Sequence, residues 1–189
     1  MQCRHEHQNE NVSQCQNALI HVVSACTRCS VRDVKQRWIV CVLALAAACA
    51  FAFSVQLGGW WSIGDVEIGP FGSRHCFGEG DCKLAGLAWV GGGDRWMRLG
   101  LATWAGGLVS MLMLVIMAAA LAAKRIPKLV AKSVLVACAT ASLAGTVFVA
   151  TFPGVEGAHL SRGAWLFVAA IVVAIASAVT VLRAKRPTS

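Results

Sequence analysis

Residues 39–56 read IVCVLALAAACAFAFSVQ and contain no Asp, Glu, Lys, Arg or His. Three more stretches of this kind lie at residues 100–121, 129–151 and 164–182, and the only such side chain in all four is Lys132. A bilayer core about 30 Å thick needs about 20 apolar residues per helix, which is close to the length of each stretch. The sequence therefore predicts an all-α membrane protein, built as a bundle of four transmembrane helices.

The overall composition supports this class. Of the 189 residues, 57% are hydrophobic and 14% are charged, whereas a soluble domain has about 45–50% apolar and about 25% charged residues. Ionisable side chains inside a span mark proton relays, ion paths and substrate sites, and transporter sites often lie where Pro interrupts a span. The four stretches lack Asp, Glu, His, Arg and Pro. A transporter, a pump or a haem protein is therefore not expected, and we expect no cofactor.

The charges predict an orientation. Twelve of the 17 Lys and Arg residues lie in the N-terminal segment, in the connection between the second and third stretches, and at the C-terminus, while six of the nine acidic residues lie in the other two loops. The positive-inside rule then puts both termini in the cytoplasm and the loops 57–99 and 152–163 outside, in a multi-pass protein of the plasma (inner) membrane. Basic residues split among three membrane-flanking segments suit anionic lipid headgroups, so nucleic acid is not an expected partner.

Three regions follow from this topology. Residues 1–37 are rich in Asn, Gln, His and Cys and predict a disordered cytoplasmic tail,. Residues 38–183 form the transmembrane domain, and residues 184–189 form a short basic cytoplasmic tail.

Two alternatives concern the start of the chain. Basic residues before an apolar run are also typical of a secretory signal, and LAAAC at residues 45–49 resembles a lipoprotein processing site. Because residues 50–55 stay apolar, we expect the first span to be uncleaved. Translation beginning nearer Val31 is the other alternative.

The first outer loop contains the most specific local signal, HCFGEGDC at residues 75–82. An outward compartment is oxidising, so Cys76 and Cys82 predict a structural disulfide, and Gly78 and Gly80 permit the tight turn between them. A redox-active pair is the first alternative. A metal site with the neighbouring His and acidic residues is the second, but oxidised sulfurs cannot supply thiolate ligands.

The rest of that loop is dense in glycine. Residues 61–68 alternate loosely and favour one or two short strands, and residues 83–90 favour a short helix that Gly91–Gly93 would end. The outer domain is thus expected to be small, closed by the disulfide, and able to contain β-structure. Its apolar face is expected to be an interaction surface, formed by Trp60, Trp61, Ile63, Phe71 and Phe77.

A second group of cysteines lies in the N-terminal tail. Cys26 and Cys29 form a single C-x-x-C pair, and the reducing cytoplasm allows thiolate ligation of zinc. A zinc site usually needs a second such pair, so no metal is expected and the tail is interpreted as disordered. If zinc does bind there, the tail would be a zinc-responsive sensor with Cys26 and Cys29 as ligands.

Four spans, a Trp-rich first outer loop with a close cysteine pair, and a small second loop resemble the claudin-like four-span (tetraspan) membrane proteins. That family carries a Gly-Leu-Trp motif, two loop cysteines and an Arg before the second span; the nearest matches here are Gly58-Gly59-Trp60, the pair Cys76 and Cys82, and Arg98. Gly59 replaces the Leu of the motif, and the motif directly follows the first span. The resemblance implies a small antiparallel outer sheet closed by the disulfide, and lateral or cell-to-cell protein contacts.

The expected function is non-enzymatic interaction or assembly, or a role as an accessory subunit, through the outer loop and the helix faces. Small residues at four-residue spacing, such as Ala141 and Gly145, allow close helix contacts within the bundle or with a partner,. The expected partners are the lipid bilayer and either further copies of the chain or another membrane protein. The alternative is a membrane thiol–disulfide oxidoreductase using the outer pair. It would need a second pair as a relay, and Cys41 and Cys49 lie about 12 Å apart along a helix.

Overall fold

The computed structural model describes residues 34–57, 59–77 and 81–184. The chain divides into two compact units, Met1–Ile39 and Val40–Ser189. In the first unit only residues 34–39 are described, and they are helical. The predicted tail up to residue 33, with Cys26 and Cys29, lies outside the described residues.

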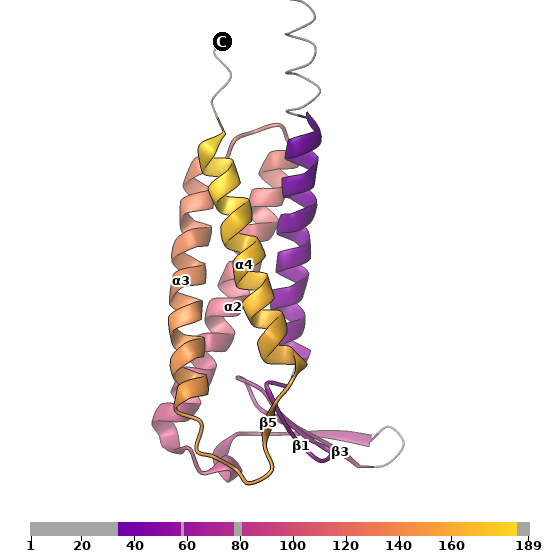
Figure 1. The fold of residues 1–189 in the computed structure, drawn as a ribbon, viewed down its shortest axis with the longest axis vertical. Coiled ribbons are helices and arrows are strands. Elements are labelled where there is room, and N and C mark those ends of the chain that lie inside the picture. Colours follow the sequence, from indigo (N-terminus) through magenta and orange to yellow (C-terminus); the bar gives the residue numbers. More distant parts are fainter. Residues whose placement is uncertain (1–33, 58, 78–80, 185–189) are drawn as a thin grey trace, which may run out of the picture. The chain divides into compact units, whose positions relative to one another are not determined.

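Four helices are long and apolar enough to cross a membrane. They are the first helix (Val34–Leu57), α2 (Gly93–Ala122), α3 (Lys128–Ala150) and α4 (Arg162–Arg183). Figure 1 shows α2, α3 and α4 beside residues 40–57 of the first helix. The four predicted helices are thus confirmed as helices, each at least 33 Å long at a rise of about 1.5 Å per residue.

The helices begin earlier than the apolar stretches do. The first helix already includes Val34, where the described residues start, whereas its apolar stretch starts at residue 39, and α2 begins at Gly93 instead of residue 100. Gly91 and Gly93 have positive φ angles of 83° and 67°, which let the chain turn sharply into α2. Asp94 then lies in the first helical turn, where a carboxylate is favourable,. Hydropathy alone does not reveal these polar first turns.

A five-stranded antiparallel sheet lies at one end of these helices, in the order β4-β3-β2-β1-β5 (Figure 1). Its strands are β1 (Trp61–Ile63), β2 (Val66–Ile68), β3 (Ser73–Phe77), β4 (Asp81–Ala85) and β5 (His159–Leu160). The strands expected within residues 61–68 are confirmed. The short helix expected at residues 83–90 is wrong, because β4 continues to Ala85 and only a 3₁₀ turn, η2 (Ala88–Val90), follows.

The fifth strand comes from the second loop, in which no strand is predicted. Trp61 of β1 pairs with Leu160, and Ser62 pairs with His159. A two-residue strand carries almost no sequence signal, since its hydrogen bonds depend on where β1 lies.

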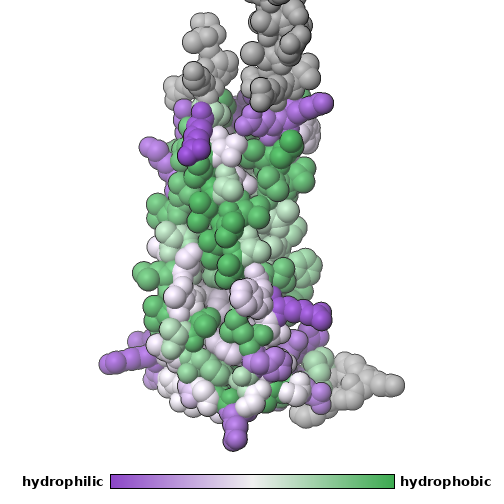
Figure 2. All heavy atoms as spheres, in the orientation of Figure 1, coloured by the Kyte–Doolittle hydropathy of each residue, from purple (hydrophilic) through white to green (hydrophobic). Residues whose placement is uncertain are grey.

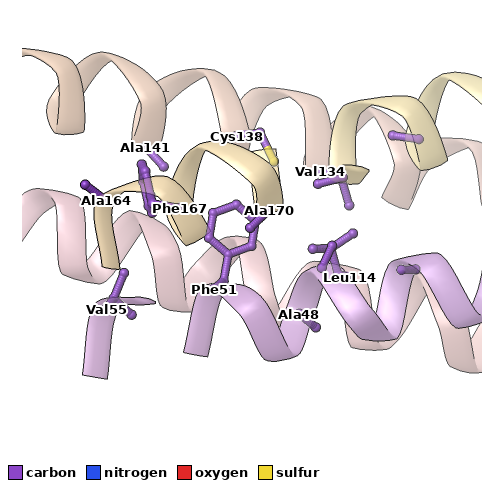
Figure 3. Packing of buried hydrophobic residues seen from close by; sticks show 14 of the residues in the cluster. Ala48, Phe51, Val55, Leu114, Val134, Cys138, Ala141, Ala164, Phe167 and Ala170 are labelled. Atoms are coloured by element: carbon purple, nitrogen blue, oxygen red, sulfur yellow. The ribbon is translucent and has the colours of Figure 1, made fainter. Parts of the chain in front are cut away.

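Small residues let the helices approach closely. A Cβ atom added to Gly106 of α2 would lie 3.1 Å from the Ala141 side chain of α3, so even an alanine at this crossing would crowd Ala141. Figure 3 shows Phe51 pointing from the first helix toward Phe167 and Ala170 of α4. The Phe51 and Phe167 rings meet edge to face, with centroids 5.5 Å apart. The sequence's small-residue spacing is therefore used, at least in part, inside the bundle.

Candidate functional site

Two ends of the second unit carry the polar and aromatic residues that could serve a function. The sheet end comprises the five strands, their loops and the adjoining helix ends. The turn end comprises the α2–α3 connection at residues 123–127 and the neighbouring ends of α3 and α4. Figure 2 shows apolar side chains covering the middle of the helices and hydrophilic ones toward both ends.

An aromatic cluster joins the sheet to the helices. Trp61 stacks on Phe152 with ring centroids 4.3 Å apart, and Trp96 stacks on Phe148 at 4.7 Å. Trp60 lies 4.9 Å from the Phe167 ring and 5.9 Å from that of Phe148. All but Phe152 are buried, so the cluster is the apolar core of this end.

The two tryptophans at the start of the loop were expected on an exposed apolar face, and this expectation is wrong for both. Trp60 and Trp61 are buried. An indole ring gains most when its large surface leaves water and its N–H finds an acceptor. The Trp60 Nε1–H meets this condition by donating to the Ser54 carbonyl oxygen at 3.2 Å.

The end of the first helix explains how that acceptor becomes available. Its last turn, η1 (Phe53–Leu57), is π-helical. Ser54 Oγ donates to the Gly163 carbonyl at 2.7 Å, and the Gly163 N–H donates to the Gly59 carbonyl at 3.0 Å. These bonds connect the first helix to the start of α4, and no motif in the sequence predicts them.

The remaining members of the expected face differ in exposure. Phe71 is 62% exposed and stacks on Trp104 of α2 with centroids 4.8 Å apart. Ile63 is half-buried, and the side chain of Phe77 lies outside the described residues. Leu84 of β4 is 87% exposed, and Trp89 of η2 is also exposed. No sequence signal distinguishes these last two residues, because exposure on a short edge strand depends on the sheet order.

The predicted cysteine pair is at disulfide distance. Cys76 and Cys82 lie directly opposite each other on β3 and β4, with their Sγ atoms 2.12 Å apart. Among the described residues the free cysteines are Cys41, Cys49 and Cys138, all in helices. No second pair is formed there, so the described residues offer no relay next to the disulfide.

Ser73 and His75 of β3 form a contact that could be mistaken for a nucleophile and its base. Ser73 Oγ lies 3.3 Å from His75 Nε2 and accepts a 2.8 Å hydrogen bond from Trp89 Nε1. It also donates to the carbonyls of Ala85 and Gly86, both at 3.3 Å. A serine hydroxyl has a single proton, which here is directed at the Ala85 and Gly86 carbonyls, and one of its two lone pairs accepts from the indole,. We therefore interpret this network as a brace between β3, the end of β4 and η2.

Within the described residues no group of three or more His, Cys, Asp and Glu could hold a metal ion. The zinc candidates Cys26 and Cys29 lie outside these residues, so the structure does not test them. The other metal alternative, beside Cys76 and Cys82, would need thiolates that the disulfide does not provide.

No protein-family model matches the chain, and no curated protein matches its sequence. The structure does contain a small antiparallel sheet closed by a disulfide, as the claudin-like resemblance implies. An architecture of this kind does not assign a family or a function. The resemblance therefore stays a prediction.

Proposed function

We propose that this chain is a non-enzymatic four-span membrane protein that assembles with other protein chains through its sheet end. The four helices support the first part of the proposal. They leave large apolar side chains exposed over their length, including Val42, Leu112, Val136 and Val172. A bundle in water would expose polar residues there, whereas hydrocarbon is a suitable solvent for these side chains.

Charge supports an orientation. The described residues at the turn end include Lys124, Arg125, Lys128, Lys132 and Arg183, and the described acidic residues lie toward the sheet end. By the positive-inside rule the turn end and both termini face the cytoplasm and the sheet faces outward across the plasma (inner) membrane. An outward sheet also suits a disulfide, because that compartment is oxidising.

The observation that carries the assembly proposal is the exposure of Leu84 on an edge strand. Cys76 donates its N–H to Asp65 on the β2 side, so by antiparallel alternation the backbone groups of Cys82 and Leu84 face the open edge of β4. Such an edge can accept a strand from another chain. An 87% exposed leucine at that edge would then be covered by the partner,.

Crosslinking in native membranes, followed by native mass spectrometry in mild detergent, tests this proposal. We expect the full chain to be recovered as a complex, with a second copy or with another membrane protein. Leu84→Gln should reduce the complex severalfold, whereas Lys83→Gln, on the same strand but the opposite face, should leave it unchanged. Recovery of monomer alone, with no co-purifying chain, would contradict the proposal.

A further inference from the structure

Positive charge is concentrated at the turn end, and the stability of the helices does not account for all of it. Five cations lie in or beside the α2–α3 connection and at the end of α4: Lys124, Arg125, Lys128, Lys132 and Arg183. All are exposed except the half-buried Lys128. In residues 34–57, 59–77 and 81–184 the carboxylates lie toward the other end, so none is available here for an ion pair.

Lys124 occupies a backbone position that normally belongs to glycine. Its φ angle is +59°, and it is the only described non-glycine residue with positive φ. Its N–H donates to the Leu121 carbonyl and that of Arg125 donates to the Ala120 carbonyl, both at 3.0 Å. This is the Schellman ending of a helix, in which Gly is preferred after the cap. A lysine in the left-handed conformation costs about 1 kcal/mol, so glycine at this position would make the fold more stable.

One more cation, Lys128, lies where a helix disfavours it. Lys128 begins α3 and Lys132 lies one turn further, and the first turn of α3 contains no acidic residue. The N-terminus of a helix carries partial positive charge, so cations there are unfavourable. Arg183, in the last turn of α4, is the favourable case. Helix stability thus explains Arg183 but not Lys128 or Lys132.

Apolar side chains flank Lys132 on its exposed side. Leu129 lies one turn before it and is 78% exposed, and Val136 lies one turn after it and is 65% exposed. Residues three and four apart share one face of a helix. A cation between two apolar side chains matches a phospholipid, which has a phosphate next to acyl chains. A free phosphate ion would gain nothing from Leu129 and Val136.

We propose that the turn end is a binding surface for anionic phospholipids of the bilayer, with headgroup phosphates held by Lys124, Lys128 and Lys132 and an acyl chain lying along Leu129 and Val136. This inference rests on the helices spanning a membrane, as in the proposed function. Long lysine side chains can extend along a helix to place the ammonium at headgroup level. Each cation near an anionic membrane surface strengthens binding to that surface about fivefold.

The test uses the full chain in nanodiscs that contain equal amounts of phosphatidylglycerol and phosphatidylcholine. Native mass spectrometry counts the lipids that remain bound to the chain after it is released from the nanodisc. We expect phosphatidylglycerol to be retained in preference, and Lys124→Gly with Lys132→Gln to lower that preference at least about tenfold. Because Lys124→Gly relieves an unfavourable φ angle, the thermal midpoint of this variant should not fall, and misfolding cannot explain the loss.

The matched control removes two charges from the sheet end, as Arg95→Gln with Arg98→Gln, and should leave the lipid preference unchanged. An equal loss in both double variants, or no loss in either, would overturn the inference. Displacement of the bound lipid by millimolar inorganic phosphate would also overturn it, in favour of a soluble anion. Resistance of the chain to alkaline extraction from membranes is scored separately. A chain that stays in the membrane but shows no lipid preference disproves this inference alone, whereas extraction disproves the membrane part of the proposed function.

Discussion

The same four helices end in two different ways. At the sheet end, Trp60, Ser54 and Gly163 join segments more than a hundred residues apart, through side chains that are buried and hydrogen-bonded. At the turn end, α2 closes through hydrogen bonds to its own last carbonyls, and the exposed side chains are cations. The sheet end is therefore held by tertiary packing, and the turn end by local backbone geometry. Changes to the buried residues of the sheet end should alter stability, whereas changes to the exposed cations of the turn end should alter lipid binding.

Removing a junction tryptophan should have the largest effect. Trp60→Ala leaves a cavity beside Phe148 and Phe167 and removes the donor to the Ser54 carbonyl. The cost is expected to be about 3–5 kcal/mol of unfolding free energy. Thermal unfolding in detergent measures it, with Trp165→Ala, an exposed tryptophan of α4, as the matched control. If both variants lose the same stability, the sheet end is not held by packing.

Opening the disulfide should have the next largest effect. Replacing Cys76 and Cys82 together by Ser frees the β3–β4 hairpin and should lower stability by about 2 kcal/mol, because a short loop constrains the unfolded chain only modestly. The same preparation is assayed for thiol–disulfide exchange with a dithiol. Loss of an exchange activity with unchanged stability would instead support the oxidoreductase alternative.

A smaller effect is expected from the hydrogen bond between the first helix and α4. Ser54→Ala removes the 2.7 Å bond to the Gly163 carbonyl, at a cost of about 1 kcal/mol,. Ser133→Ala is the control, because Ser133 is exposed and bonds only to its own helix, at Leu129. Chemical denaturation compares the two variants. Equal midpoints would mean that the tie to α4 is not part of what holds the sheet end.

The smallest effect on stability should come from the turn end, and its sign should be reversed. Lys124→Gly relieves the left-handed conformation but adds freedom to the unfolded chain, for a net gain of about 0.5 kcal/mol. Arg125→Gly, next along the chain and without a positive φ angle, should instead be neutral or destabilising. A stability loss in Lys124→Gly would show that its side chain, and not only local backbone geometry, holds the turn.

The turn end follows from the sequence more fully than the sheet end does. Apolar length located the helices, because each needs only its own residues to be apolar. The spacing and the oxidising compartment predicted that Cys76 and Cys82 pair, because the two are close in the chain. The exposed position predicted for Trp60 and Trp61 was wrong, because two adjacent tryptophans at the end of a span are equally typical of the membrane interface and of a buried core. Their burial depends on Phe148 and Phe167, which lie about ninety or more residues away.

What the sequence by itself determined is the set of four helices, the charge difference between the two ends, and the close cysteine pair. Each of these depends on composition or on short spacing, so distant residues do not change it. Only the tertiary structure decided that the second loop supplies β5, that Ser54 binds Gly163, that Leu84 is left exposed on an edge strand, and that Lys124 takes a left-handed conformation. These features arise where segments meet or where a helix must end, and there the contacts and the backbone geometry, not the local pattern, set the free energy.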